Sequence, residues 1–243
     1  MTSGPVDGAY LAAGLRRLLP QGVAVVASAG EIDDGPLFAV EASAVREACA
    51  ARRAEFATGR ALARRAMGDL GHPPAPVPVG RGREPVWPVG LAGSISHSAG
   101  WFVAAVAERR GCWALGIDVE SCARLSADAL AALRRFVLSA EERRSIGTDR
   151  WAALEIFSAK EAAFKALSPY AEHSFSLGAF RAVARTPGQL ALRLTRPLGG
   201  RLPAGTAVPV RLHRGCGIVL AAAFLSRPPR TGDRPEGRDD AWH

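Results

Sequence analysis

The sequence predicts an α/β fold of the α+β kind, in which one helix followed by strands occurs twice along 243 residues. The clearest observation is an apolar stripe from Trp151 to Leu167, where large apolar residues recur at spacings of three and seven, as on a helix packed against a core. The segments from Trp101 to Ala107 and from Trp113 to Glu120 are apolar and include β-branched residues, which is typical of buried strands. A chain of this length accommodates one large domain or two of about 110 residues each.

Four further segments of the N-terminal part can be assigned in chain order. A short helix is predicted around Leu11 to Leu19, and a strand from Val23 to Ala27. The segment from Ala42 to Leu70 is rich in Ala, Arg and Glu, which predicts one long helix. The proline- and glycine-rich stretch from His72 to Gly90 is expected to form an ordered loop.

The C-terminal part continues the same alternation. Residues Ser126 to Ala140 predict a second helical region, and Ala191 to Thr195 and Val208 to Leu225 predict strands of a closing sheet. A hairpin turn is expected at Arg214 to Gly217. Residues 227–243 contain almost no core-forming residue, so a disordered tail is expected there.

The two lysines of the chain, Lys160 and Lys165, both lie on the helix predicted from Trp151 to Leu167. All other basic side chains except histidine are arginines, so these two positions are expected to need a compact ammonium. Glu161 and Lys165 are one helical turn apart, and Lys160 points about a quarter turn away. An ordinary surface salt bridge is the alternative interpretation. The shortage of lysine elsewhere favours a chemical role.

Carboxylates on a strand and on this helix form a candidate metal site. Asp118 and Glu120 are two residues apart and therefore project to one side of the predicted strand. With Glu161 they provide three hard oxygen donors without a nearby Cys or His at metal-binding spacing, a set that suits Mg²⁺. The alternative is that Asp118 caps the following turn and that Glu120 is solvated.

A polar segment, Gly93 to Ser98, precedes the apolar run that begins at Trp101. It is expected to form a turn whose hydroxyls, amides and His97 imidazole face an anion. A serine hydrolase is excluded because Ser96 and His97 are adjacent and no Gly-x-Ser-x-Gly elbow is present. A satisfied structural histidine is the alternative for His97.

Composition limits the partners and the compartment. The formal net charge of +8 indicates an acidic partner, such as nucleic acid, lipid headgroups or an acidic protein. No aromatic RNA-binding motif or zinc-finger spacing supports nucleic acid. The four cysteines form no Cys-x-x-Cys pair, so neither a zinc site nor a disulfide framework is indicated. The cytoplasm is expected, since no apolar run reaches membrane-spanning length and no signal peptide is evident.

Taken together, the motifs resemble those of the phosphopantetheinyl transferases of the Sfp type, in the branch that includes siderophore and actinobacterial-type synthetase activators. The resemblance is carried by Gly93 to Ser98, by Gly116 to Glu120 and by Phe157 to Ala166, in the same order and spacing. The basic segment Arg52 to Arg60 and the link Pro85 to Pro88 add to it. Several motifs in order are much more specific than any one of them.

The resemblance implies a fold of two similar α/β halves related by pseudo-twofold symmetry, with coenzyme A between them. Residues 1–111 would form the first half and residues 112–226 the second, followed by the tail from 227 to 243. Ser96 and His97 would then belong to the first half, and Asp118 and Glu161 to the second.

The activity implied is transfer of 4'-phosphopantetheine from coenzyme A to a serine of an apo acyl or peptidyl carrier protein, with release of 3',5'-ADP. Asp118, Glu120 and Glu161 would hold Mg²⁺ on the pyrophosphate. Glu161 would also act as the base for the incoming serine, and Lys165 would neutralise or protonate the departing 3',5'-ADP.

Further residues are implied to bind phosphate groups. Two belong to the polar segment and one to the helix, namely Ser96, His97 and Lys160. Arginines from the basic segment would hold the 3'-phosphate, namely Arg52 or Arg53 together with Arg60. His97 is also expected to take part in catalysis.

The resemblance and the composition together predict a monomer that acts without nucleic acid or membrane as a partner. A Mg²⁺-dependent phosphohydrolase acting on nucleotides or coenzyme A is the nearer alternative, because the same three carboxylates would serve it. A basic nucleic-acid-binding protein is the more distant one.

Overall fold

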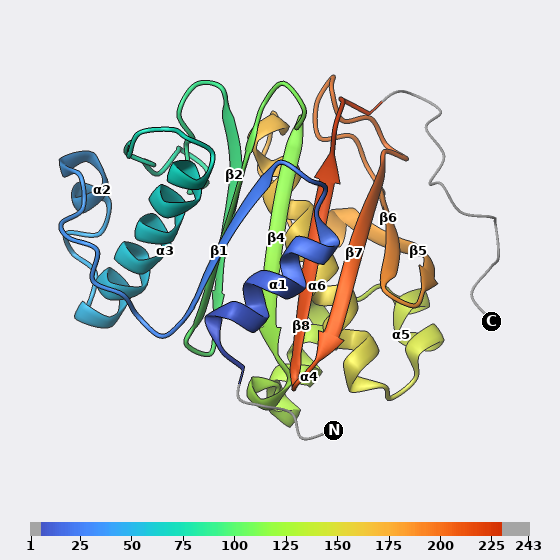
Figure 1. The fold of residues 1–243 in the computed structure, drawn as a ribbon. Helices are drawn as coiled ribbons and strands as arrows, with labels where there is room; N and C mark the ends of the chain where they lie inside the picture. The colour runs from blue at the N-terminus through green and yellow to red at the C-terminus, as the bar shows by residue number, and fades with distance from the viewer. Residues whose placement is uncertain (1–5, 230–243) are drawn as a thin grey trace.

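The computed structural model describes residues 6–229, which form two antiparallel sheets with helices packed on them (Figure 1). The first sheet has the strand order β1-β3-β2, with β1 (Val23–Ala29), β2 (Leu91–Ser98) and β3 (Trp101–Glu108). The second has the order β4-β8-β7-β6-β5, with β4 (Ala114–Ser121), β5 (Phe180–Thr186), β6 (Gln189–Leu194), β7 (Ala207–Gly215) and β8 (Ile218–Leu225). The predicted α+β class is confirmed.

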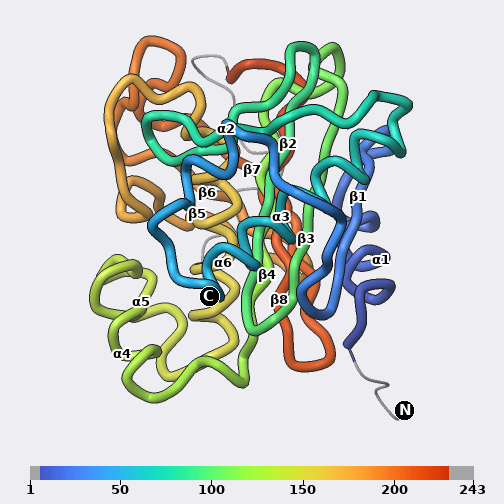
Figure 2. The backbone as a smooth tube through the Cα atoms, turned by 90° about the vertical axis from the view of Figure 1, so that its left-hand side faces the viewer, coloured from blue at the N-terminus to red at the C-terminus, as the bar shows by residue number. Residues whose placement is uncertain are grey.

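Six α-helices lie among the described residues: α1 (Gly8–Leu18), α2 (Ala39–Ala44), α3 (Ala50–Asp69), α4 (Ala127–Phe136), α5 (Ala140–Ile146) and α6 (Arg150–Leu167). The long helix α3 packs on the first sheet and the long helix α6 on the second, while α1 crosses the opposite face and contacts both sheets (Figures 1 and 2). Each sheet therefore has one long helix on it. Within residues 6–229, no helix is both long and apolar enough to cross a membrane.

Local sequence signals explain where the site-bearing helix begins and ends. The Asp149 side chain accepts hydrogen bonds from the N–H groups of Trp151 and Ala152, which caps the start of α6. One face of the helix is buried in the core of the second sheet. After Leu167 the chain tightens into a 3₁₀ turn that contains Pro169, as expected where proline removes a backbone donor.

Two expectations about the N-terminal part are wrong. The long helix expected from Ala42 to Leu70 is divided into α2 and α3 by residues 45–49. The buried Glu41 carboxylate accepts from the Phe38 and Val77 N–H groups and from Arg64, so tertiary contacts override a helix-favouring composition.

The polar segment Gly93 to Ser98 is part of strand β2 rather than a turn. Its residues pair with β3 without interruption, from Leu91 opposite Glu108 to Ser98 opposite Trp101. The positive φ angles of Ala99 and Gly100 make the tight turn between the strands. Alternating serines thus line one face of β2, in the period-two spacing that is typical of a strand.

The two predicted halves share part of their core. One cluster of buried side chains combines α1 with β1, β3, β4 and β8, and so draws on both sheets. The predicted division at residue 111 falls in the turn between β3 and β4. Residues 230–243, most of the predicted tail, lie outside the described part of the chain.

Candidate active site

The candidate site lies on the seam between the two sheets, where edge strand β2 of the first runs beside edge strand β4 of the second. Serine hydroxyls on β2 bridge this seam. Ser94 Oγ accepts a hydrogen bond of 3.0 Å from the Ile117 N–H, which fixes the two strands relative to each other. The next two serines along β2 reach the carboxylates of β4.

Asp118 is the centre of a buried hydrogen-bond network and is 2% exposed. Its Oδ1 accepts from Ser96 Oγ at 2.9 Å and from Lys165 Nζ at 2.7 Å, and its Oδ2 accepts from Ser158 Oγ at 2.8 Å. Lys165 also donates to Ser96 Oγ at 2.8 Å. The network joins β2, β4 and α6, so these three elements are held together at one point.

Glu120 lies at the exit of this seam, where Ser98 Oγ donates to its Oε2 at 3.0 Å. Burial, reinforced by the nearby charge of Asp118, raises the pKa of Glu120 to about 7. Burial and the charge of Asp118 likewise raise the pKa of Glu161 on α6. The three carboxylates therefore repel one another, as expected of a site that accepts a cation.

The alternatives considered for these acidic residues and for Lys165 do not hold. Asp118 is buried within β4 and caps no turn, and Glu120 is largely shielded from water. Lys165 pairs with Asp118 at the seam and makes no surface bridge to Glu161 among the described ion pairs. Its ammonium therefore faces the site.

The environment of Lys160 does not suit the phosphate-binding role predicted for it. It is 0% exposed, and its Nζ donates to Glu142 Oε2 at 2.7 Å and to the Val137 carbonyl at 2.9 Å. Burial lowers its pKa, against the opposing effect of Glu142. Because its ammonium is enclosed by protein acceptors, direct phosphate binding by Lys160 is inconsistent with the structure.

His97 projects from the other face of β2, toward α3. Its Nε2 lies 3.2 Å from Nη1 of Arg52, and its ring stacks on Phe102 at 5.6 Å between centroids. Burial lowers the pKa of His97, which keeps the imidazole neutral and available as an acceptor or donor. Arg52 also pairs with Glu55 at 3.2 Å.

The other arginines of the basic segment differ in exposure. Arg60 is 7% exposed, stacks on Phe56 and donates from Nε to the Val77 carbonyl at 2.7 Å. Burial lowers its pKa to about 10. Arg53 is exposed and donates to the Ala48 carbonyl, so Arg52 is the one of the two that reaches His97.

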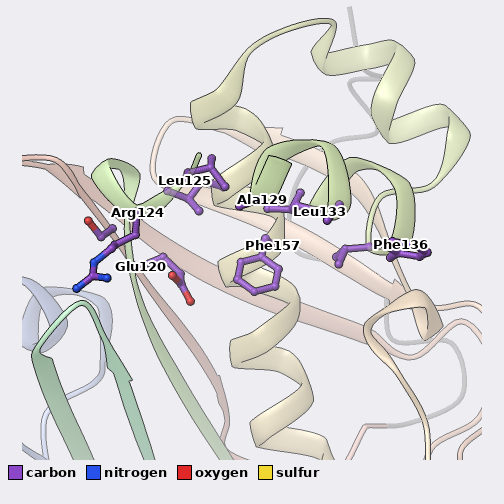
Figure 3. A pocket seen from close by; sticks show the side chains of 11 residues that line it. Glu120, Arg124, Leu125, Ala129, Leu133, Phe136 and Phe157 are labelled. Carbon is purple, nitrogen blue, oxygen red and sulfur yellow. The ribbon is translucent and has the colours of Figure 1, made fainter. Parts of the chain in front are cut away.

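An apolar pocket of about 490 Å³ opens beside Glu120, between the end of β4, helix α4 and helix α6 (Figure 3). Phe157 of α6 projects into it close to Glu120, below the apolar side chains of α4 (Figure 3). Leu125, Leu133 and the 73% exposed Phe136 complete its apolar wall. Acidic and apolar surfaces thus meet at this point.

Sequence reasoning missed several residues of the site. Ser94, Ser98 and Ser158 were not singled out, although each makes a hydrogen bond to β4. The alternation of serines two residues apart along Gly93 to Ser98 was the available signal. Nothing local to Ser158 distinguishes it, because its role depends on how α6 packs on β4.

Comparison with known proteins identifies the family. The family model for the 4'-phosphopantetheinyl transferase N-terminal domain matches residues 40–107, and that for the 4'-phosphopantetheinyl transferase superfamily matches residues 114–205. The boundary between the two matches coincides with the turn between β3 and β4.

Three relatives are similar over more than half of the chain. The 4'-phosphopantetheinyl transferase Svp of Streptomyces mobaraensis is 36% identical over 81% of this chain and 82% of its own length. PptT of Mycobacterium tuberculosis is 38% identical over 53% of this chain and 57% of its own. Npt of Nocardia iowensis is 32% identical over 64% and 69%. The chain therefore belongs to the 4'-phosphopantetheinyl transferase superfamily.

Proposed function

We propose that the seam between β2 and β4 is where this enzyme transfers 4'-phosphopantetheine from coenzyme A to a serine of an apo carrier protein. The observation that carries the proposal is that Asp118 and Glu120 of β4 and Glu161 and Lys165 of α6 come together beside the serines of β2 in the first sheet. Phosphoryl transfer needs positioning and charge neutralisation more than covalent help from the protein. This group of residues supplies both.

The donor chemistry of the carboxylates fits Mg²⁺. Within the described residues no three His, Cys, Asp or Glu side chains are arranged to hold a metal ion, and Asp118 is paired with Lys165. Burial and the charge of Asp118 raise the pKa values of Glu120 and Glu161, and a bound cation would favour the charged carboxylates there. We propose that Asp118, Glu120 and Glu161 hold Mg²⁺, which when bound would neutralise the pyrophosphate of coenzyme A.

The side chains of the seam suit the proton and charge movements of the reaction. Glu161 would accept the proton of the incoming serine hydroxyl, directly or through water. Lys165, held by Asp118 and Ser96, would stabilise the negative charge that develops on the departing 3',5'-ADP. Ser96 would then act by orienting that ammonium.

The basic face formed by α3 and β2 suits the other end of coenzyme A. Arg52 and His97 lie in contact there, and Arg60 lies two turns along α3. We propose that they bind phosphate groups, with Arg60 and Arg52 on the 3'-phosphate. Arg53 remains a candidate through its exposed guanidinium.

The apolar pocket suits the uncharged part of the substrate. It adjoins Glu120 and is lined mainly by apolar side chains, so a charged group would be poorly solvated inside it. We propose that the pantetheine arm of coenzyme A occupies this pocket. We further propose a cytoplasmic monomer, with neither nucleic acid nor membrane as a partner.

Intact-mass spectrometry of apo acyl and peptidyl carrier proteins tests the activity. Incubation with coenzyme A and Mg²⁺ should add one phosphopantetheine group to the carrier, and a chelator should prevent it. Release of 3',5'-ADP from coenzyme A without modification of any carrier would instead indicate the phosphohydrolase.

A further inference from the structure

Lys160 is a fully buried lysine adjacent in sequence to Glu161 of the proposed site. Its neighbours on the two preceding turns, Phe157 and Leu154, line the apolar pocket, whereas Lys160 itself points away toward the junction of α4 and α5. Burying a charged side chain is unfavourable unless it is fully paired. The groups that the Lys160 ammonium binds should therefore explain why a lysine is buried at this position.

Glu142, the partner of Lys160, binds three separate elements. Its Oε2 accepts from Lys160 Nζ at 2.7 Å and from the Ser139 N–H, also at 2.7 Å, and its Oε1 accepts from the Ala182 N–H of β5 at 2.8 Å. The Ser139 hydroxyl in return accepts from the Glu142 N–H, which completes a capping box at the start of α5.

The same ammonium fixes the end of α4. Lys160 Nζ donates to the carbonyl of Val137, the residue directly after α4, and the Val137 side chain lines the pocket together with Leu133 and Phe136. One buried charge thus joins α6, the α4–α5 junction (residues 137–139) and, through Glu142, strand β5. The α4 wall of the pocket is therefore tied to the helix that carries Glu161 and Lys165.

We propose that Lys160 and Glu142 form a positioning pair that sets the α4 wall of the apolar pocket relative to Glu161, and that Lys160 contacts no phosphate. A lysine suits this position because a compact ammonium can reach a carboxylate and a carbonyl within a closed space, whereas a planar guanidinium is larger. The effect on turnover rests on the proposed function, but the structural part of the inference stands on the contacts alone.

Hydrogen–deuterium exchange of the intact chain tests the structural part. In Lys160→Met, which keeps the side-chain length but removes the charge, amides of residues 133–146 should exchange at least about tenfold faster, while those of α3 stay unchanged. The double variant Lys160→Met/Glu142→Gln removes both charges and should recover part of the lost protection; the rest stays lost, because an amide nitrogen cannot accept one of the two backbone hydrogen bonds that Glu142 accepts from Ser139 and Ala182. Glu141→Gln, an exposed neighbour on the same helix, is the matched control and should behave like the wild type.

Ligand binding distinguishes positioning from phosphate binding and from a merely structural role. In Lys160→Met the affinity for 3',5'-ADP, which lacks the pantetheine arm, should be unchanged, whereas that for coenzyme A should fall roughly tenfold. The double variant should regain part of the affinity for coenzyme A. A merely structural role would reduce the amount of folded protein. It would leave the ratio of the affinities for coenzyme A and 3',5'-ADP unchanged.

Two results would overturn the inference: unchanged exchange of residues 133–146 in Lys160→Met, or a loss of 3',5'-ADP affinity that the double variant does not restore. The second result would return Lys160 to phosphate binding. If the wild-type protein modifies no carrier, the proposed function fails, yet the exchange measurement still decides whether Lys160 and Glu142 position the wall.

Discussion

Lys165 and Lys160, the two lysines of the chain, lie five residues apart on α6 in opposite environments. Lys165 is 26% exposed and faces the seam, where it binds Asp118 and Ser96. Lys160 is enclosed with Glu142 behind the α4–α5 junction. The scarcity of lysine thus marks two sites that require a compact cation, for two different physical reasons.

Conservative substitution should separate the two lysines. Lys165→Arg is expected to retain stability but to lower kcat for carrier modification by about tenfold, because a guanidinium does not readily give up a proton and fits the Ser96–Asp118 pair poorly. Lys160→Arg should instead lower the free energy of unfolding by about 2 kcal/mol through overpacking.

Steady-state kinetics at saturating coenzyme A, combined with urea unfolding, would measure both effects. Wild-type kcat in Lys165→Arg would show that only the positive charge matters at that position. Unchanged stability in Lys160→Arg would contradict the tight enclosure of its side chain.

Arg60 and Arg52 are expected to recognise the 3'-phosphate of coenzyme A. Alanine at either position should raise the apparent KM for coenzyme A by roughly tenfold or more, since charge-assisted hydrogen bonds are lost. It should raise the KM for 3'-dephospho-coenzyme A far less. Equal increases for both substrates would show that these arginines act elsewhere.

At the level of single residues, the sequence indicated the charged members of the site better than its neutral ones. Asp118, Glu120, Glu161 and Lys165 could be selected because their side chains imply chemistry and fall within recognisable motifs. The roles of Ser158 and Glu142 depend on the packing of α6 against other elements, which no local pattern reveals.

Helix α6 lies unusually close to strand β4, and this contact depends on Gly116. A Cβ atom at residue 116 would lie 1.9 Å from the Ala162 carbonyl oxygen and 2.7 Å from the Ala166 backbone nitrogen. These are backbone atoms of the turns that carry Glu161 and Lys165. The absence of a side chain at residue 116 therefore lets the helix approach Asp118.

Gly116→Ala should accordingly move α6 away from β4. We expect a loss of about 3 kcal/mol in the free energy of unfolding together with a marked loss of transfer. The control is Gly68→Ala in α3, where a Cβ meets nothing within 4 Å and the substitution should stabilise the helix by about 0.5 kcal/mol. Chemical denaturation of both variants checks this, and similar stabilities would contradict the close contact.

Among the elements, those with strong periodicity were predicted well and those defined by tertiary contacts were not. Helix α6 and the hairpin of β7 and β8 follow the predicted segments closely, because their apolar patterns and turn residues agree. The interruption between α2 and α3 has no Gly or Pro to signal it, and β5 contains exposed arginine and threonine residues that weaken its pattern.

The whole molecule combines two sheets through one shared core. Leu11 and Leu15 of α1 pack in the same buried cluster as Val103 of the first sheet and Ile117 and Leu220 of the second. Hydrophobic burial of this kind couples the stabilities of the parts that share it. The two halves should therefore fold together.

Equilibrium unfolding followed by tryptophan fluorescence and by circular dichroism should give one coincident transition, because both sheets lose the shared core at once. Tryptophans in both halves report on the process, with Trp101 in the first and Trp113 in the second. Two separate transitions would show that residues 1–111 and 112–226 are independent folding units.

The central claim is that the carboxylates at the seam carry the transfer, and two glutamates of α6 allow a matched comparison. Glu161 lies at the seam with a raised pKa, so its charged form destabilises the folded state at neutral pH. Glu155, on the same helix, pairs with Arg185 and Arg214 away from the seam.

The most direct measurement is kcat for carrier modification in Glu161→Gln and Glu155→Gln, with melting temperatures recorded for both. Glu161→Gln should lose at least about a hundredfold in kcat while its melting temperature stays the same or rises. Glu155→Gln should keep its turnover but melt earlier, since two arginines lose a charged partner. Turnover close to that of the wild type in Glu161→Gln would contradict the assignment of the site.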